Sequence, residues 1–115
     1  MRVQVILNPW ADRGRGAQQA ELIQQVAQPY GGVDLVQTQR PGHAIELARQ
    51  AADDGYDMVV AAGGDGTISD VVNGLMRGSK AVTKLGIIPI GSGNDLAWSL
   101  KIPTDVATAV QQLFT

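Results

Sequence analysis

The sequence predicts an α/β domain in which a parallel sheet lies between helices on both of its faces. Short apolar runs alternate with amphipathic helical patterns along the whole chain. The apolar runs contain few polar residues, which is typical of parallel strands buried on both faces. The 14 glycines are more than an average chain of this length contains, and many directly follow an apolar run. Together these observations favour three layers joined by right-handed crossovers.

Four apolar runs are expected to form the strands of the sheet. Their lengths and their content of Val, Ile and Leu suit buried strands. They cover residues 3–8, 33–38, 57–62 and 85–90. The carboxyl ends of parallel strands meet at one edge of the sheet, and ligands of such sheets bind there.

Helical periodicity fills the segments between these runs. Residues 16–28 form one pattern before Pro29, and residues 43–55 form a second that stops at Gly55. The inward face of the second pattern is expected to consist of Ala44, Ile45, Ala48, Ala51 and Ala52.

Three more helices are expected in the second half of the chain. One follows the glycines at 63–66, because apolar residues recur at helical spacing at Ile68, Val71, Val72, Leu75 and Met76. A short helix is expected at 96–100. The last is expected within 102–114, with Thr104 as its N-cap and Val106, Val110, Leu113 and Phe114 facing inward.

Composition and charge exclude several classes of function. The chain has room for one domain, 44% of its residues are hydrophobic, and its net charge is −2. No basic cluster indicates a nucleic-acid partner. The lack of cysteine excludes disulfides and thiolate zinc sites and favours a cytoplasmic protein. The first apolar run is too short to span a membrane, so any membrane contact is expected to be peripheral.

Gly63, Gly64 and Gly66 surround Asp65 where the third apolar run meets a helical pattern. The first amides of a helix lack intrahelical partners and lie at the positive end of its dipole, so they can hold an anion. Glycines let this backbone approach phosphate oxygens closely. A carboxylate beside a phosphate is expected either to hold Mg²⁺ or to act on a hydroxyl proton.

Helix capping is the structural alternative at this junction. Thr67 and Asp70 have the spacing of a capping box, and Asp65 could itself be an N-cap. For Thr67, capping and ligand contact are equally open. Three glycines around an aspartate exceed what capping requires, so ligand binding is favoured.

A second loop, GSGND at 91–95, repeats the arrangement after the fourth apolar run. Ser92 and Asp95 again have the spacing of a capping box, so a structural role is open there too. Asn8 and Thr38 end the first two runs at the same edge, and for both a plain turn is the alternative. Two Gly/Asp loops at consecutive strand ends would line one crevice.

Common nucleotide motifs are absent. No segment has the G-x-x-x-x-G-K-[ST] pattern of a P-loop, and Ser69 and Leu96 stand where a dinucleotide G-x-G-x-x-G pattern needs Gly or Ala. His43, the single histidine, begins a helical pattern and is expected at the surface or in a cap.

GGDGT at 63–67, VVNGL at 71–75 and GIIPIGSGNDLA at 86–97 together resemble the nucleotide-binding domain of the diacylglycerol kinase catalytic family. This family includes bacterial lipid kinases and sphingosine and ceramide kinases. GGDGT alone is shared with NAD kinases, whereas P-x-G-[ST]-x-N-D-[FL]-A points to lipid kinases. The resemblance covers nearly the whole chain and implies a Rossmann-like fold of the NAD kinase–diacylglycerol kinase type.

The resemblance implies that the γ-phosphate of ATP is transferred to a lipid hydroxyl with Mg²⁺ as a cofactor. It assigns the catalytic role and the contact with Mg²⁺ to Asp65. The residues it implies in ATP binding are Asn8, Thr38, Gly63, Gly64, Asp65, Gly66, Thr67, Ile68, Ser69, Asp70, Ser92, Gly93 and Asn94. The chain departs from the family where Ser69-Asp70 replaces Asn-Glu and Asp12 replaces a frequent glycine.

The resemblance also implies a second domain, a β-sandwich with the lipid pocket, that is not expected within these residues. Residues 1–115 are therefore interpreted as a single ATP-binding domain that is inactive or nearly so alone. The implied acceptor is a diacylglycerol or sphingoid lipid, and the implied location is the cytoplasm, with peripheral contact at the inner membrane face. Self-association is also expected. The alternatives are an NAD kinase-like enzyme and a nucleotide-binding module without catalysis.

Overall fold

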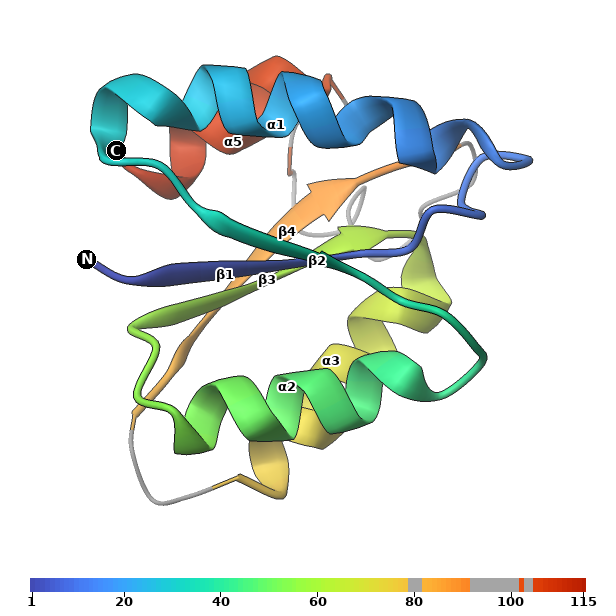
Figure 1. Ribbon diagram of the computed structural model, residues 1–115, viewed down its shortest axis with the longest axis vertical. Helices are drawn as coiled ribbons and strands as arrows, with labels where there is room; N and C mark the ends of the chain where they lie inside the picture. Colours follow the sequence, from blue (N-terminus) through green and yellow to red (C-terminus); the bar gives the residue numbers. More distant parts are fainter. Residues whose placement is uncertain (79–81, 92–101, 103–104) are drawn as a thin grey trace.

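A computed structural model describes residues 1–78, 82–91, 102 and 105–115. Its centre is a sheet of four parallel strands in the order β2-β1-β3-β4 (Figure 1). The strands are β1 (Val3–Leu7), β2 (Asp34–Gln37), β3 (Met58–Gly63) and β4 (Lys84–Pro89). Each lies within one residue of its predicted bounds, and the predicted fold class is confirmed.

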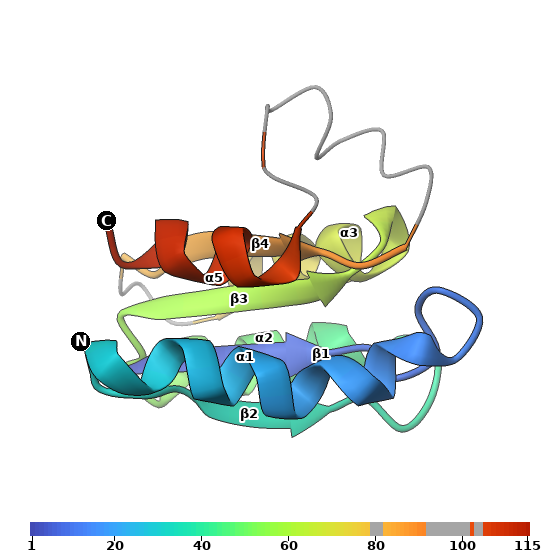
Figure 2. The same ribbon diagram turned by 90° about the horizontal axis from the view of Figure 1, so that it is seen from above.

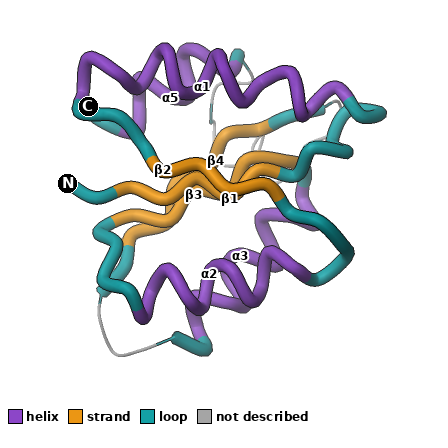
Figure 3. The backbone as a smooth tube through the Cα atoms, in the orientation of Figure 1, coloured by secondary structure: helices purple, strands orange, loops and turns teal. Residues whose placement is uncertain are grey.

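Helices cover both faces of the sheet, as Figure 3 shows. On one face lie α1 (Gln19–Ala27) and α5 (Val106–Leu113), and on the other lie α2 (His43–Asp53) and α3 (Asp65–Met76). The 3-10 turns η1 (Arg15–Gln18) and η2 (Gln28–Tyr30) flank α1. The helix predicted at 96–100 lies outside the described residues.

The order of the strands creates a switch point between β1 and β3. The chain leaves β1 for β2 on one side and then returns across β1 to β3 on the other. Crossovers of one hand that run in opposite directions place their helices on opposite faces, as α1 and α2 are placed here. All four strands point to the same edge in Figure 2, so the switch point opens at their carboxyl ends.

Two apolar cores stabilise the layers. Under α1 and α5 the buried cluster includes Val5, Leu7, Ile23, Val60 and Val110. Under α2 and α3 the cluster is made of smaller residues. They are Ile6, Ala44, Ala48, Ala51, Val59, Ala61, Ile68, Val71 and Ile87. The alanines predicted on the inward face of α2 are therefore confirmed, and they let this helix lie close to the sheet and to α3.

The end of α2 is a Schellman motif. Gly55 has a φ of +82°, which favours glycine. The Gly55 amide donates to the Ala52 carbonyl (3.2 Å) and the Tyr56 amide to the Ala51 carbonyl (3.2 Å). Gly55 was predicted to end this helix, and that prediction is confirmed.

The structure rules out the capping alternative at the start of α3, and it contradicts the predicted cap of α5. The N-cap of α3 is Gly64, so neither Asp65 nor Thr67 caps this helix, and the first intrahelical bond joins the Ile68 amide to the Gly64 carbonyl (3.1 Å). A glycine in extended conformation leaves no side-chain signal in the sequence, and the cap spacing of Thr67 and Asp70 was therefore misleading.

The predicted cap of α5 was wrong, because this helix begins at Val106 with Asp105 as its N-cap. Thr104, the predicted cap, lies outside the described residues. Asp105 Oδ2 accepts hydrogen bonds from the hydroxyl (2.6 Å) and the amide (3.0 Å) of Thr108, and these bonds lower the pKa of the Asp105 carboxyl. The Asp105 carboxylate thus accepts from an amide of the first turn that has no partner within the helix.

Gly74 lies at a close contact between α2 and α3. A Cβ added there would overlap the carbonyl oxygen of Ile45 and come within 2.7 Å of the Ala48 Cβ. Because moving the Ile45 backbone would require a shift of the whole helix, α2 and α3 can keep their present separation only with glycine at position 74.

We expect Gly74→Ala to lower the free energy of unfolding by about 1–2 kcal/mol, since overpacking outweighs the gain in helix propensity. Asn73→Ala, at the exposed neighbouring position, is the matched control and is expected to leave stability unchanged or slightly raised. Urea denaturation measures both. Equal stability of the two variants would show that α2 and α3 do not meet as described.

A polar cluster joins the amino-terminal ends of β1, β2 and β3. The Tyr56 hydroxyl donates to Asp34 Oδ2 (2.7 Å), and the Arg2 guanidinium lies 4.4 Å from the Tyr56 ring centroid. The hydrogen bond to Asp34 raises the pKa of Tyr56 above its ordinary value, with smaller contributions from burial and from the Asp34 charge. Arg2 opposes this rise.

The raised pKa predicts a loss of stability at alkaline pH. Folding favours protonated Tyr56, so its contribution is complete below about pH 10 and disappears as the pH rises through the higher folded pKa. Stability of the wild type should fall more steeply above pH 10 than that of Tyr56→Phe. Tyr30→Phe, which keeps its ring stack on Phe114, is the control and should follow the wild type. Parallel curves for wild type and Tyr56→Phe would contradict the assignment.

Candidate functional site

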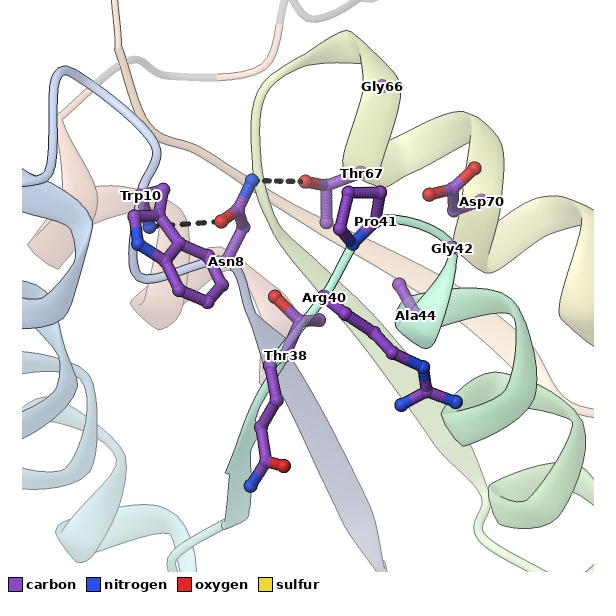
Figure 4. Close-up of a pocket in the computed structure, with 11 residues that line it drawn as sticks. Asn8, Trp10, Thr38, Arg40, Pro41, Gly42, Ala44, Gly66, Thr67 and Asp70 are labelled. Carbon is purple, nitrogen blue, oxygen red and sulfur yellow. Dashed lines mark hydrogen bonds between the residues drawn. The ribbon is translucent and has the colours of Figure 1, made fainter.

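Two cavities lie side by side at the carboxyl edge of the sheet. The first, of about 470 Å³, lies between the end of β1, the β2–α2 turn and the start of α3, and we call it the β2-side cavity (Figure 4). The second, of about 330 Å³, lies between the β1–η1 loop, the start of α3 and the end of β4, and we call it the β4-side cavity. Both are lined by Asn8, Gly66 and Thr67, so they meet at one point.

The N-terminus of α3 forms that meeting point. Gly66 and Thr67 precede the first intrahelical bond of α3, so their amides have no acceptor within the helix. A Cβ added at Gly66 would meet no atom within 4 Å, so the space over this backbone is open. The helix therefore presents amide donors and the positive end of its dipole to both cavities.

Gly63 has a different role from Gly66. A Cβ at Gly63 would come within 2.6 Å of Thr67 Oγ1 and 2.8 Å of Thr67 Cβ. The glycine thus lets the Thr67 side chain, which is only 7% exposed, lie directly over the end of β3. Gly63 lines neither cavity and supports the site from below.

Asn8 joins three parts of the edge. Its Nδ2 donates to Thr67 Oγ1 (3.4 Å), and its Oδ1 accepts from the Trp10 amide (3.0 Å), as the dashed lines in Figure 4 show. Its own amide donates to the Ala62 carbonyl (2.9 Å), which extends the pairing of β1 with β3. The end of β1, the start of α3 and the β1–η1 loop are therefore held by one side chain.

The β2–α2 turn forms the far wall of the β2-side cavity. Thr38, 7% exposed, continues the ladder through its amide to the Leu7 carbonyl (2.9 Å). His43 was expected at the surface or in a cap; it is half-buried, and its Nδ1 accepts from the Gln39 amide (3.0 Å) of the preceding turn, while Gly42 is the N-cap of α2. Arg40 Nη2 pairs with Glu46 Oε2 at 2.6 Å.

The β1–η1 loop follows a path that requires unusual backbone angles. Asp12 and Arg13 have φ values of +53° and +58°, and Gly14 follows at +87°. Left-handed angles are uncommon outside glycine, so Asp12 and Arg13 adopt a conformation that few side chains tolerate. Both Asp12 and Arg13 line the β4-side cavity.

Seven of the predicted site residues line the two cavities: Asn8, Thr38, Gly64, Asp65, Gly66, Thr67 and Asp70. Ile68 does not, because it is buried against α2, and Ser69 is exposed outside both cavities. Ser92, Gly93 and Asn94 lie outside the described residues. Sequence reasoning missed Trp10, Arg13, Gln39 and Arg40, which line the cavities through the course of two loops.

The carboxylates at this edge suit a metal ion that is shared with a ligand. Asp65 and Asp12 line the β4-side cavity and Asp70 the β2-side cavity. Across residues 1–78, 82–91, 102 and 105–115, no cluster of three or more His, Asp or Glu could hold a metal ion. Mg²⁺ commonly binds one or two carboxylates and completes its shell with phosphates and water, and the donors present fit that pattern.

Fold and cavities together define a class: an α/β domain with two cavities that meet at a helix N-terminus, on the carboxyl edge of its sheet. The sequence profile described as "Diacylglycerol kinase catalytic domain" matches residues 2–115, and the chain belongs to that family.

Curated relatives and solved structures agree with this assignment. A diacylglycerol kinase of Bacillus subtilis (strain 168) is 38% identical over 105 residues, 90% of this chain and 34% of the relative. A diacylglycerol kinase of Staphylococcus carnosus (strain TM300) is 42% identical over 73 residues, 64% and 24% of the two chains. A crystal structure of a diacylglycerol kinase from Bacillus anthracis str. Sterne superposes with a TM-score of 0.85 and 27% identity. The match covers 98% of this chain and 41% of that one.

The chain therefore spans about a quarter to a third of the length of these curated relatives. Within the part of the chain that the structure describes, none of the helices has the length and apolar character needed to cross a membrane.

The two hydrogen bonds of Asn8 lead to a prediction about its substitutions. Asn8→Asp keeps an acceptor for the Trp10 amide but loses the donor to Thr67, whereas Asn8→Ala loses both. We expect Asn8→Ala to cost about 1–2 kcal/mol of unfolding free energy and Asn8→Asp clearly less, because the retained bond is the shorter one. Chemical denaturation of both variants measures this order, and the reverse order would contradict the described contacts.

Proposed function

We propose that this chain is the ATP-binding part of a lipid kinase, which transfers the γ-phosphate of ATP to a lipid hydroxyl of the diacylglycerol type. The observation that carries the proposal is the open backbone at Gly66, where the start of α3 faces both cavities. Phosphoryl transfer depends mainly on positioning and on neutralising charge, and backbone amides with a metal can supply both.

The two cavities suggest how ATP is divided between them. The β2-side cavity has more apolar walls, including Trp10, Pro41 and Ala44, and its volume suits a nucleoside. The β4-side cavity is lined by charged groups and by the start of α3, and suits the outer phosphates. Gly66 and Thr67, shared by both, would contact the phosphates that link the two halves. Thr38 and Asp70 would contact the nucleoside half.

Asp65 is the proposed contact with Mg²⁺, which would supply positive charge to the phosphates when bound. A carboxylate in the first turn of α3 would otherwise repel an anion at the same amides, so the cation resolves a conflict within the site. The same carboxylate lies at the edge where an attacking hydroxyl must approach, and we propose that it also helps to orient that hydroxyl.

The proposed acceptor is a lipid, because the relatives are named diacylglycerol kinases. These relatives are three to four times as long as the matched region, so residues that choose the acceptor are proposed to lie in another domain of such an enzyme. This chain alone is accordingly proposed to bind ATP and to transfer phosphate slowly or not at all. Its place of action would be the cytoplasmic face of a membrane.

Binding of Mg²⁺-ATP can be tested by thermal unfolding and calorimetric titration. A nucleotide concentration about 100 times Kd should stabilise the wild type by about 2.7 kcal/mol. Gly66→Val should abolish this gain, because the new side chain would occupy the open space over the α3 amides. Ser69→Val, in the same turn but outside both cavities, is the matched control and should bind normally. Tighter binding of NAD than of ATP would favour a kinase with a soluble acceptor instead.

The role of Asp65 has a separate test. Asp65→Asn keeps the size of the side chain and removes its charge, so the dependence of ATP affinity on Mg²⁺ should become much weaker. ATP titrations with Mg²⁺ and with EDTA, for the wild type and the variant, measure this difference. An unchanged Mg²⁺ dependence in Asp65→Asn would remove Asp65 from the metal site.

A further inference from the structure

Trp10 is the one large apolar side chain among those lining the β2-side cavity that remains mainly exposed. Its exposed fraction is 58%, which is high for a residue of this size. Figure 4 shows it at one end of the cavity, across from the β2–α2 turn. An exposed indole at the wall of a cavity has a face available for contact with a flat ligand.

The backbone of Trp10 is held on both sides. Its amide donates to Asn8 Oδ1 (3.0 Å), and its carbonyl accepts from the Gly14 amide (3.0 Å). Asn8 is in turn bound to Thr67, so the position of Trp10 is coupled to the start of α3. A side chain that is exposed but anchored at its backbone can bind a ligand without a large cost in ordering the loop.

Other residues of the β2-side cavity are less suited to stack on a base. Arg40 has a planar group, but this group is engaged with Glu46 at 2.6 Å. Among the described residues that line the cavity, Trp10 is the only aromatic one. Pro41 and Ala44 offer apolar surface on the opposite side without hydrogen-bond donors that would read the edge of a base.

We propose that Trp10 stacks on the base of the bound nucleotide and thereby makes affinity depend on the base as well as on the phosphates. This inference rests on the proposed function, since it requires a nucleotide in the β2-side cavity. An aromatic side chain stacks on any base face, so Trp10 strengthens binding of nucleotides over bare polyphosphates rather than selecting one base.

The test compares two ligands, Mg²⁺-ATP and Mg²⁺-tripolyphosphate, which share phosphates and differ in the nucleoside. Trp10→Ala should weaken ATP about tenfold and leave tripolyphosphate unchanged. Trp10→Phe should restore most of the ATP affinity. Trp10→Leu, which is apolar but not aromatic, should remain weak. A Trp98→Phe background leaves Trp10 as the single tryptophan, and its fluorescence should respond to ATP and not to tripolyphosphate.

Several results would overturn the proposal. Equal weakening of both ligands by Trp10→Ala would mean that the residue only shapes the loop, and full affinity of Trp10→Leu would mean that it only covers apolar surface. If the wild type binds tripolyphosphate as tightly as ATP, the phosphate site stands and stacking fails. If it binds neither ligand, the proposed function itself fails together with this inference.

Discussion

The close approach of Thr67 to the backbone of Gly63 is the constraint on which the rest of this molecule depends. No Cβ fits at residue 63, and for that reason the first turn of α3 can lie directly over the end of β3. Thr67 Oγ1 then accepts from Asn8, and Asn8 holds the Trp10 amide. A single missing side chain thus determines where the end of β1, the start of α3 and the β1–η1 loop lie relative to one another. Both cavities follow from this arrangement.

Packing on the far side of α3 serves the same edge. The small residues of α2 let it lie against both the sheet and α3, and Gly74 permits a close approach of the two helices. Because α2 begins at the carboxyl edge, its position also determines the course of the β2–α2 turn. His43, the first residue of α2, accepts from the Gln39 amide and fixes that turn from the helix side. The wall of the β2-side cavity is therefore a consequence of helix packing well below it.

The strands were predictable from sequence because burial on both faces requires a continuous apolar run. The bounds of all four strands lie within one residue of the predicted bounds. The start of α3 was not, since an extended Gly64 cap gives no side-chain signal while Thr67 and Asp70 give a misleading one. The residues of the predicted site came from two glycine motifs and from the ends of the first two strands, and these could not reveal Trp10 or Arg13. Asp12 and Arg13 turn this loop through left-handed angles, and no side-chain pattern in the sequence predicts such angles at non-glycine residues.

In the proposed complex, main-chain amides contact the phosphates, whereas side chains determine the contacts with the rest of the ligand. Amides at the start of α3 would bind phosphate through main-chain atoms, so the exposed Ser69 side chain can vary without removing those donors. The β1–η1 loop is different, because its contribution depends on which side chains it presents. Its backbone is nevertheless closed on itself, by the Gly14 amide on the Trp10 carbonyl and the Gly16 amide on the Ala11 carbonyl (2.8 Å). A Cβ at Gly16 would lie 2.5 Å from the Asn8 carbonyl oxygen, so this closure brings the loop firmly against β1. Trp10 on such a loop can change without moving the amides at the start of α3, and selectivity among ligands with the same phosphates can therefore evolve there independently.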